Sequence, residues 1–402
     1  MTTYRAEWVL PISRDPVRNG WVTIGNGRIA QVGTGDVSGS VNLGRVALLP
    51  GLVNAHTHLE LAYLHGRIPP AASFGPWVRA VMTARRAYPD AADSEILAPA
   101  RAAIAAMRAT GTALVGDVSN TLVTAPLLRD ARMPAQIFHE LTGFTEQDPP
   151  ARVRAARARA DAAIVAEHSD IRVSVAPHAP YSVSRDLFLA IRADLDAHPG
   201  AVSSVHLGEN PEEMELLREG TGEIRAVLEE LGRWPDDWRP PGTSPVRYLE
   251  DLGFLDARTL VVHGVQFLGE DLARLSAIGA TLISCPRSNV YVGVGSPPLE
   301  AFYAMDVEVA FGTDSLASVT DLDMFAELAE ARRIAPRVPA RRLLESATLV
   351  GARALRFDAE FGSLEPGRRA AVLAVRVPEG VSDVEEYLVS GVPSESVSWL
   401  EA

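Results

Sequence analysis

Two histidines separated by one residue follow an apolar segment near the start of the chain. The sequence there reads Val53-Asn54-Ala55-His56-Thr57-His58. In an extended strand, side chains two residues apart point to the same face, about 6.6 Å from each other. Both imidazoles can therefore reach one metal ion. A chance pair of surface histidines is the alternative, but the chain has only nine histidines and this pair directly follows an apolar stretch.

Three further polar residues, His206, His263 and Asp314, end apolar segments later in the chain. Taken singly, each histidine is a better candidate for a structural role, and the aspartate for a helix cap. Together with the first pair they offer imidazoles and a carboxylate, which suit a divalent ion with an open coordination position. Such an ion lowers the pKa of a bound water to about 7 and supplies hydroxide at neutral pH. Zn²⁺ and Fe²⁺ both suit these ligands.

A carboxylate follows the third of these histidines at a spacing that favours proton transfer. Glu209 lies three residues after His206, just beyond the end of an apolar segment. Deamination of an aromatic N=C–NH2 unit requires hydroxide attack on carbon together with protonation of the ring nitrogen, and a carboxyl group can carry that proton. The alternative for Glu209 is a favourable charge at the start of the helix that follows.

The composition excludes several other chemistries. All 38 basic residues are arginine, so Schiff-base catalysis, a phosphate-loop lysine and a carbamylated lysine bridging two metal ions are impossible. The net charge of -13 disfavours nucleic-acid binding. No apolar run approaches the roughly 18 residues of a membrane helix. The single cysteine, Cys285, can form no internal disulfide, which fits a reducing, cytoplasmic setting. We expect a small-molecule substrate.

The elements that must position these residues alternate along the centre of the chain. Eight apolar segments predict buried parallel strands, and helical segments separate most of them. The predicted strands are Val46–Ala55, Ala113–Val118, Ala135–Leu141, Arg172–Ala176, Val202–Leu207, Thr259–Val265, Ala280–Ser284 and Glu308–Gly312; the predicted helices include Ser94–Ala109, Pro150–Glu167, Glu212–Leu231 and Gly269–Ile278. This order is typical of a (β/α)8 TIM barrel, in which the chemistry lies at the C-terminal ends of the strands.

Both ends of the chain are rich in strand-forming residues. Asn26-Gly27, between alternating apolar residues, is a strong hairpin signal. We therefore predict a small β-sandwich domain built from residues 1–50 and 356–402, which flanks a barrel of residues 51–355. The Pro- and Trp-rich segment Trp234–Pro245 is predicted to be a long surface excursion that covers the site.

The positions of these residues resemble the amidohydrolase superfamily over nearly the whole chain. Because the chain has no lysine, it is similar to the mononuclear branch. The resemblance implies that the metal ligands are His56, His58, His206 and Asp314, and that His263 orients or deprotonates the metal-bound water. It also implies a homodimer. One departure is Ala370-Ala371, where such families usually carry Ala-Asp, but this pair lies in the predicted β domain.

The His-x-x-Glu motif at His206 and Glu209 resembles the aromatic deaminases of that superfamily. In those enzymes the glutamate transfers the proton, and the residue equivalent to Asp314 would pass a proton to the departing ammonia. The segments most similar to aminodeoxyfutalosine deaminases of the menaquinone pathway are Val53–Leu59, Pro177–Ser184, 243–250, Cys285–Asn289 and Val309–Ser318. Deamination of S-adenosylhomocysteine, adenosine or guanine, and hydrolysis of a triazine, are the alternatives. A non-catalytic binding module is a third alternative; its signature would be a missing ligand residue, and none is missing here.

Four residues are predicted to contact the substrate. His178 is a candidate for a ribose hydroxyl, or a structural histidine in a proline-fixed turn. Arg287 would pair with a substrate carboxylate, or neutralise nearby acids. Trp77 would stack on a planar ligand, or belong to the core. Asn289, in the same segment as Arg287, is the fourth.

Overall fold

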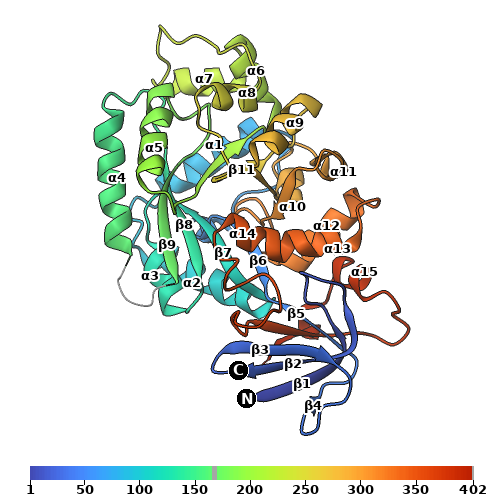
Figure 1. Ribbon diagram of the computed structural model, residues 1–402. Helices are drawn as coiled ribbons and strands as arrows, with labels where there is room; N and C mark the ends of the chain where they lie inside the picture. The colour runs from blue at the N-terminus through green and yellow to red at the C-terminus, as the bar shows by residue number, and fades with distance from the viewer. Residues whose placement is uncertain (165–169, 401–402) are drawn as a thin grey trace.

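The computed structural model describes residues 1–164 and 170–400. Two groups of strands organise it: a sheet with strands from both ends of the described chain, and eight parallel strands with helices around them (Figure 1). Within the described residues, no helix combines the length and the apolar character that a membrane span needs.

Strands from both ends of the chain lie in one seven-stranded sheet, at the bottom of Figure 1. Its order is β15-β14-β5-β1-β2-β3, and β4 pairs with β1. The bounds are β1 Thr2–Val9, β2 Val17–Gly25, β3 Arg28–Thr34, β4 Val41–Asn42, β5 Val46–Pro50, β14 Val372–Arg376 and β15 Val397–Trp399. The predicted hairpin is confirmed: Asn26 and Gly27, at φ +53° and +70°, join β2 to β3.

The segment predicted as one strand over Val46–Ala55 is two strands. β5 pairs with β1 and β14 in the terminal sheet, whereas β6 (Leu52–Thr57) pairs with β7. The chain changes sheets at Gly51, where a Cβ would lie 2.5 Å from that of Ala113, so only glycine permits this close crossing. The sequence did not indicate this change of sheet, because β5 and β6 are both buried and together form one continuous apolar segment.

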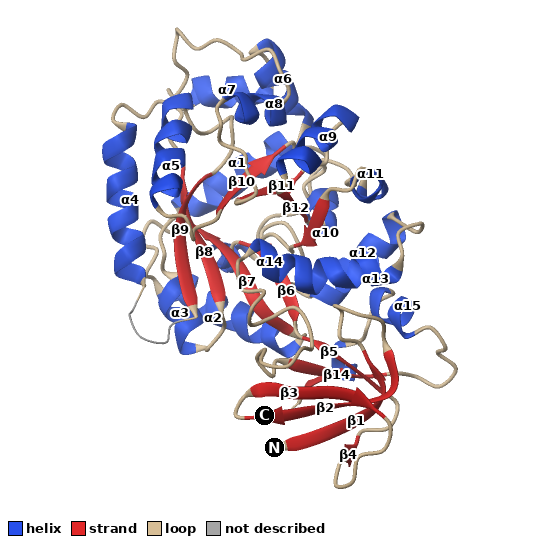
Figure 2. Ribbon diagram, in the orientation of Figure 1, coloured by secondary structure: helices blue, strands red, loops and turns tan. Residues whose placement is uncertain are grey.

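The eight parallel strands form two sheets of four, in the orders β6-β7-β8-β9 and β10-β11-β12-β13 (Figure 2). Their bounds are β6 Leu52–Thr57, β7 Thr112–Ser119, β8 Ala135–Leu141, β9 Ile171–Pro177, β10 Ser203–Leu207, β11 Thr259–His263, β12 Thr281–Ser284 and β13 Glu308–Phe311. The sheets touch at both edges: His206 N donates to His178 O over 2.9 Å, and Thr313 N donates to His56 O over 3.0 Å. Every strand therefore lies beside its neighbours in chain order, and the ends that carry polar residues face one another.

Helices lie around these strands. They are α1 Phe74–Arg86, α2 Ser94–Ala109, α3 Thr124–Asp130, α4 Pro149–Ala163, α5 Arg185–Ala197, α6 Pro211–Glu219, α7 Glu223–Glu230, α8 Pro245–Asp251, α9 Gly269–Ile278, α10 Pro286–Tyr291, α11 Leu299–Ala304, α12 Met324–Ile334, α13 Ala340–Glu345, α14 Gly351–Ala354 and α15 Val384–Val389, with short 3-10 turns at Leu59–Leu64 and Ser394–Ser396 and a π turn at Ser346–Val350.

Two predicted helices differ from the structure. Glu212–Leu231 is not one helix but two, because Gly220 adopts a left-handed conformation (φ +72°) that ends α6. The helix predicted over Pro150–Glu167 is α4, which ends at Ala163, and Glu167 lies outside the described residues.

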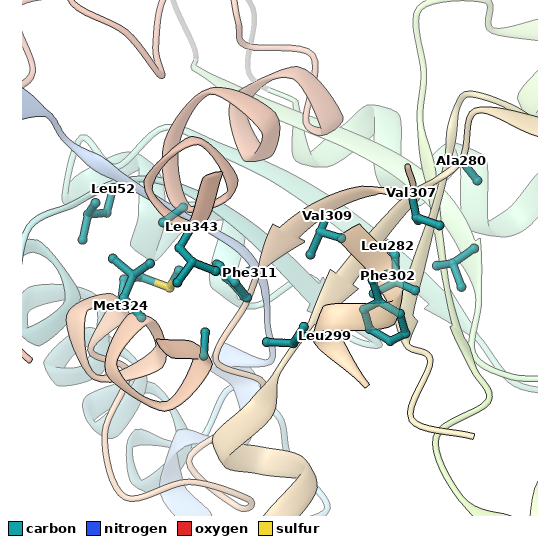
Figure 3. Close-up of a cluster of buried hydrophobic side chains, with 14 of the residues drawn as sticks. Leu52, Ala280, Leu282, Leu299, Phe302, Val307, Val309, Phe311, Met324 and Leu343 are labelled. Atoms are coloured by element: carbon teal, nitrogen blue, oxygen red, sulfur yellow. The ribbon is translucent and has the colours of Figure 1, made fainter. Parts of the chain in front are cut away.

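An apolar layer joins β12 and β13 to helices α11, α12 and α13 (Figure 3). Leu282 and Val309 come from the strands, and Phe302, Met324 and Leu343 from the helices; all five are at most 2% exposed. Burial at about 25 cal/mol per Å² of apolar surface makes this layer a main source of stability near the eighth strand. We call these five residues and their neighbours in Figure 3 the apolar layer.

Candidate active site

Six sequence-predicted residues converge at the C-terminal ends of the parallel strands. We call them the strand-end cluster: His56, His58, His206, Glu209, His263 and Asp314. They come from β6, β10, β11 and β13 or the residues that follow these strands. Side chains distant in sequence meet here because the strands are parallel and in register at this end.

His56 lies at the bottom of the cluster and is fully buried. Neither of its ring nitrogens has a hydrogen-bond partner among the described residues. Its neighbour strand approaches closely because Gly312 has no side chain; a Cβ there would lie 2.7 Å from that of His56. An unpartnered buried imidazole is costly, so these free nitrogens indicate that a ligand completes the site.

His58 and His206 point at each other beside His56. Their Nε2 atoms are 3.3 Å apart, and their rings stack with centroids separated by 5.3 Å. The backbone after His58 is fixed because Leu59 N donates to the Asp117 carboxylate over 2.9 Å. Nδ1 of His206 faces the carbonyl oxygen of His178 at 3.1 Å, which leaves Nε2 for the centre of the cluster.

Asp314 presents one carboxylate oxygen to the histidines. Oδ1 lies 3.9 Å from His56 Nε2 and 3.6 Å from His58 Nε2. Oδ2 accepts hydrogen bonds from the hydroxyl groups of Ser288 and Ser318, over 2.7 and 3.0 Å. These two bonds hold the carboxylate in place and leave Oδ1 free.

His263 completes the group of imidazoles, and Asn289 holds it. His56, His206 and His263 have ligand atoms within 4.8 Å of one another. The Asn289 side-chain amide lies 3.0 Å from Nδ1 of His263, so Nε2 faces the cluster. Asn289 is fully buried and does not line the cavity. Its place in the structure therefore favours a role in holding His263 over the predicted contact with substrate.

The backbone is strained at two cluster positions. His263 and Asp314 have φ values of +80° and +60°, in a region that non-glycine residues rarely occupy. Such conformations cost on the order of 1–3 kcal/mol each and persist only where the surrounding structure enforces them. They turn the two side chains inward at the strand ends.

Burial keeps the cluster imidazoles neutral, which is the form that binds a metal ion. It lowers the pKa of His58 to about 3 and, together with the charge of His178, that of His206 to about 4. The pKa values of His56 and His263 fall well below 6.5 for the same reason. Neutral nitrogens and a carboxylate oxygen form a donor set that fits one Zn²⁺ or Fe²⁺ ion. The strand-end cluster can therefore hold a single divalent ion.

Glu209 lies beside the histidines of the cluster and is not one of the four residues predicted to bind the metal ion. Its Oε1 is 3.6 Å from Nε2 of His263, and its side chain lines the cavity above the cluster. Burial raises the pKa of Glu209 well above its ordinary value, and the charges of Asp314 and Glu213 add to this effect. Glu213 also accepts a hydrogen bond from the Glu209 N–H over 3.3 Å. The environment thus favours a protonated Glu209 that can donate.

A cavity of about 550 Å³ opens above the cluster. Its walls are largely apolar, and they include Phe74, Trp77 and Phe144, with Ile224 and Leu228 from α7. Trp234 and Trp238, from the predicted excursion Trp234–Pro245, pack on Phe144 with ring centroids 6.1 and 5.8 Å away. This segment therefore backs one wall of the cavity.

Two predicted substrate residues lie at the cavity and one does not. His178 and Trp77 both line it, and the Trp77 indole N–H donates to Ala317 O over 3.1 Å. Arg287 does not line it. Its guanidinium makes two 2.8 Å bonds to the Asp321 carboxylate, which favours the alternative that Arg287 neutralises nearby acids over a pairing with a substrate carboxylate.

Sequence analysis missed Glu140 and a group of arginines at the cavity. Glu140 is the penultimate residue of β8 and is 6% exposed. Its signal was available, since a polar residue near the end of a buried strand is the pattern that identified His206. The arginines are Arg86 of α1, Arg152 of α4 and Arg233 after α7. The sequence did not indicate that they line the cavity, because the residue type alone does not show which face of a helix is turned to the site.

The fold and the cluster define a class of protein, namely an α/β enzyme with a single divalent metal site at its strand ends. The chain belongs to the amidohydrolase family, whose model matches residues 47–392. An aminodeoxyfutalosine deaminase from Deinococcus radiodurans is 32% identical over 323 residues, which cover 76% of this chain and 72% of that protein.

Two further relatives extend this similarity. A 5-methylthioadenosine/S-adenosylhomocysteine deaminase from Teredinibacter turnerae is 32% identical over 343 residues, covering 82% of this chain and 71% of that protein. Among solved structures, an adenosine deaminase from Xanthomonas campestris with bound zinc has a TM-score of 0.83 and 25% identity, covering 98% of this chain and 90% of that one.

Proposed function

We propose that this protein is a metal-dependent deaminase that removes the 6-amino group of an adenine nucleoside by hydrolysis. In this proposal residues 51–355 form a (β/α)8 barrel, and residues 1–50 and 356–402 form a β-sandwich domain. The observation that carries the proposal is a buried carboxyl, Glu209, beside a complete set of metal ligands and open to the same cavity.

The ligands are His56, His58, His206 and Asp314. His56, His58 and Asp314 have ligand atoms within 4.8 Å of one another, and Nε2 of His206 lies 3.3 Å from Nε2 of His58. The unpartnered nitrogens of His56 support an ion bound among these groups. A divalent ion in this site supplies hydroxide at neutral pH by lowering the pKa of water. His263 directs Nε2 to the same site, where it orients the attacking oxygen.

Glu209 moves the proton that deamination requires. Water adds to the carbon that bears the amino group; one C–O bond forms, and the ring C=N electrons pass to the ring nitrogen. Protonated Glu209 donates its proton to that nitrogen, in keeping with its raised pKa. Asp314 Oδ1 accepts one proton of the water and passes it to the amino group. The C–N bond then breaks and ammonia leaves, while the added oxygen forms a C=O bond and its remaining proton returns to Glu209.

The apolar walls of the cavity suit a planar base. Trp77 lines the cavity, and its N–H bond to Ala317 O fixes the plane of the indole. An aromatic face held in this way stacks on a flat ligand with an energy of about 0.5–1.5 kcal/mol beyond the area buried. Trp77 thus supports a heteroaromatic substrate.

Unpaired arginines support a substrate with an anionic group away from the base. Arg86, Arg152 and Arg233 line the cavity, and no carboxylate of the described chain forms an ion pair with them. In a protein with a net charge of -13, cations without partners at a cavity favour an anionic ligand. Aminodeoxyfutalosine, which carries a benzoate, is our first candidate, and S-adenosylhomocysteine is the second because relatives of both names match at 32% identity.

A screen of purified, metal-loaded protein tests this function. Ammonia release is measured with aminodeoxyfutalosine, S-adenosylhomocysteine, adenosine and guanine, and chloride release with a chlorotriazine. We expect the highest kcat/KM with aminodeoxyfutalosine. Absence of ammonia from every amine would refute the deaminase, and chloride release alone would assign the site to triazine hydrolysis.

Two further parts of the proposal concern the setting of the enzyme. We place it in the cytoplasm, in keeping with its single cysteine, Cys285, which is buried and free. We also propose a homodimer. Light scattering of the purified chain measures its mass, and a monomer would contradict the dimer.

A further inference from the structure

Glu213 is a buried acid next to the candidate active site that does not itself reach the cavity. It is the third residue of α6, it is fully buried, and it does not line the cavity. Its Oε2 accepts a hydrogen bond from the backbone N–H of Glu209 over 3.3 Å. The N–H of Gly208 bonds to the same carboxyl group. Glu213 therefore contacts the main chain that carries the candidate proton donor.

The start of α6 is capped by a different residue. The side-chain oxygen of Asn210 accepts a hydrogen bond from the Glu213 N–H over 2.9 Å. In an ordinary capping box, the side chain of the third helical residue returns a bond to the N–H of the cap residue. Glu213 instead reaches past Asn210 to Glu209 and Gly208, the two residues before it. Its side chain thus holds the segment between β10 and α6.

The carbonyl group of Glu209 is held from a neighbouring strand. The side-chain amide of Gln266, in the segment after β11, donates to Glu209 O over 3.4 Å and to Val294 O over 3.1 Å. The Gln266 N–H donates to Gly208 O over 2.8 Å. The peptide groups on both sides of the Glu209 Cα are therefore fixed by hydrogen bonds.

Close packing adds to these bonds. Gly208 has a φ of +63°, and a Cβ at this position would lie 2.2 Å from the ring of Phe267, so only glycine permits the contact. From this backbone the Glu209 side chain extends until its Oε1 lies 3.6 Å from Nε2 of His263. The place of the Glu209 carboxyl group in the cavity therefore depends on contacts made by its main chain.

We infer that Glu213 is a positioning residue that, through the backbone, fixes the Glu209 carboxyl group beside His263. Gln266 has the same role from the carbonyl side. This inference rests on the proposed function, in which Glu209 donates a proton to the ring nitrogen. A proton donor must lie within hydrogen-bond reach of the atom that it protonates, and a displacement of about 1 Å can reduce the rate about 100-fold.

Glu213→Met tests this role, because methionine has an unbranched side chain and only a weak acceptor. Ammonia release is measured with aminodeoxyfutalosine and adenosine. We expect kcat to fall roughly 10- to 100-fold, with KM within about threefold of wild type and an unchanged metal content. A kcat within threefold of wild type would overturn the inference, and so would loss of the metal ion.

Glu213→Gln is the conservative variant and should restore activity. Its amide oxygen can accept the same backbone N–H groups, so kcat should stay within about threefold of wild type. Burial raises the pKa of Glu213 to about 8, so the neutral amide also resembles the acid that is present at neutral pH. An equal loss in Glu213→Gln and Glu213→Met would contradict a role as hydrogen-bond acceptor.

A double-variant cycle shows whether Glu213 acts through Glu209. In Glu209→Gln the side chain carries no proton, so its exact place no longer matters. Adding Glu213→Met to this variant should therefore lower kcat by less than about threefold. A further loss of tenfold or more would mean that Glu213 acts on the whole site, which would overturn the inference.

A matched control and a second variant support this cycle. Glu215→Met makes the same change on the same helix at an exposed acid that bonds to the Thr221 hydroxyl over 2.8 Å, and it should keep the wild-type kcat. If Glu213→Met does not fold, Gln266→Met releases the Glu209 carbonyl instead. The same loss of kcat is expected, and the same results would overturn the inference.

Crystal structures keep the inference distinct from the proposed function. If no amine releases ammonia, the deaminase fails, but the place of Glu209 can still be compared between metal-loaded wild type and Glu213→Met. We expect its Oε1 to move by about 1 Å or more relative to His263 Nε2, whereas Glu215→Met should leave it in place. An unmoved Glu209 in Glu213→Met would contradict the role of Glu213.

Discussion

The strand-end cluster and the apolar layer are both buried, but they are built in opposite ways. The cluster contains an imidazole whose two nitrogens have no partner in the described part of the chain, and two residues in strained backbone conformations. The apolar layer contains side chains such as Phe302 and Leu282, which are fully buried among other hydrocarbons. The cluster lowers the stability of the fold, whereas the apolar layer raises it. The residues of the candidate active site and the residues that stabilise the fold are therefore different.

Removal of the metal ion should give the largest difference between the two regions. A chelator is expected to reduce deaminase activity to background and to lower the apparent unfolding temperature, because an ion that binds only the folded state stabilises it. Zn²⁺ or Fe²⁺ should restore both. Activity that survives while metal analysis shows a fully stripped protein would contradict the single-ion site.

Glu209→Gln should reduce kcat by about 10²- to 10⁴-fold, because an amide cannot carry the proton. Metal content and unfolding temperature should remain close to wild type, since Glu209 is not one of the four ligands. Glu215→Gln, on the helix α6 that follows Glu209 and bonded to the Thr221 hydroxyl, is the matched control and should keep full activity. A kcat within tenfold of wild type for Glu209→Gln would remove this residue from the mechanism.

Phe302→Ala, in the apolar layer, is expected to lower stability and leave activity nearly unchanged. Because Phe302 is fully buried, we expect the free energy of unfolding to fall by about 3–5 kcal/mol in denaturant titrations. The kcat of the folded fraction should stay within about twofold of wild type. Leu268→Ala is the control, since this side chain is 61% exposed, and it should change the free energy of unfolding very little. An equal loss of stability in both variants would contradict the role of the apolar layer in stability.

Glu327→Gln tests how a buried acid beside the apolar layer affects stability. Glu327 lies on α12. Burial raises the pKa of Glu327 to about 8, above its ordinary 4.5. Its contribution to stability is therefore complete below about pH 4.5 and is lost as the pH rises toward 8, by up to about 1.4 kcal/mol per pH unit. Unfolding measured from pH 5 to 8 should show a steeper loss in wild type than in the variant. Parallel curves would contradict the raised pKa.

Arg287→Gln should have the smallest effect on activity. Its guanidinium pairs with Asp321 outside the cavity, so kcat/KM for an anionic nucleoside should change less than about threefold. Arg152→Gln, at an unpaired cavity residue, is the comparison and should lower kcat/KM several-fold with increasing effect at low salt. A tenfold loss confined to Arg287→Gln would restore it as a substrate residue.

Much of the site was predictable because it depends on local patterns. His56 and His58 share a face through the two-residue period of a strand, and His206, His263 and Asp314 each end an apolar run. Parallel strands then bring these ends together, so strand ends in sequence become neighbours in space. The Asn26-Gly27 hairpin was predictable for the same reason, since its geometry is set by two adjacent residues.

Arg287 and Asn289 could not be placed in this way. Arg287 is held by Asp321, 34 residues later in the chain, and Asn289 by His263, 26 residues earlier. Both follow the seventh parallel strand, yet both side chains turn away from the cavity. Their direction depends on how α10 packs, which the residue types alone leave open.

Sequence alone determined which residue types are available, that no lysine can bridge two metal ions, and where apolar strands end in polar groups. Tertiary structure alone decided which of these groups remain without partners, as with His56 and Glu140, and which arginines face the cavity unpaired. The reason is physical: strand periodicity is a local property, whereas hydrogen-bond and charge pairing depends on the distances between side chains far apart in the chain.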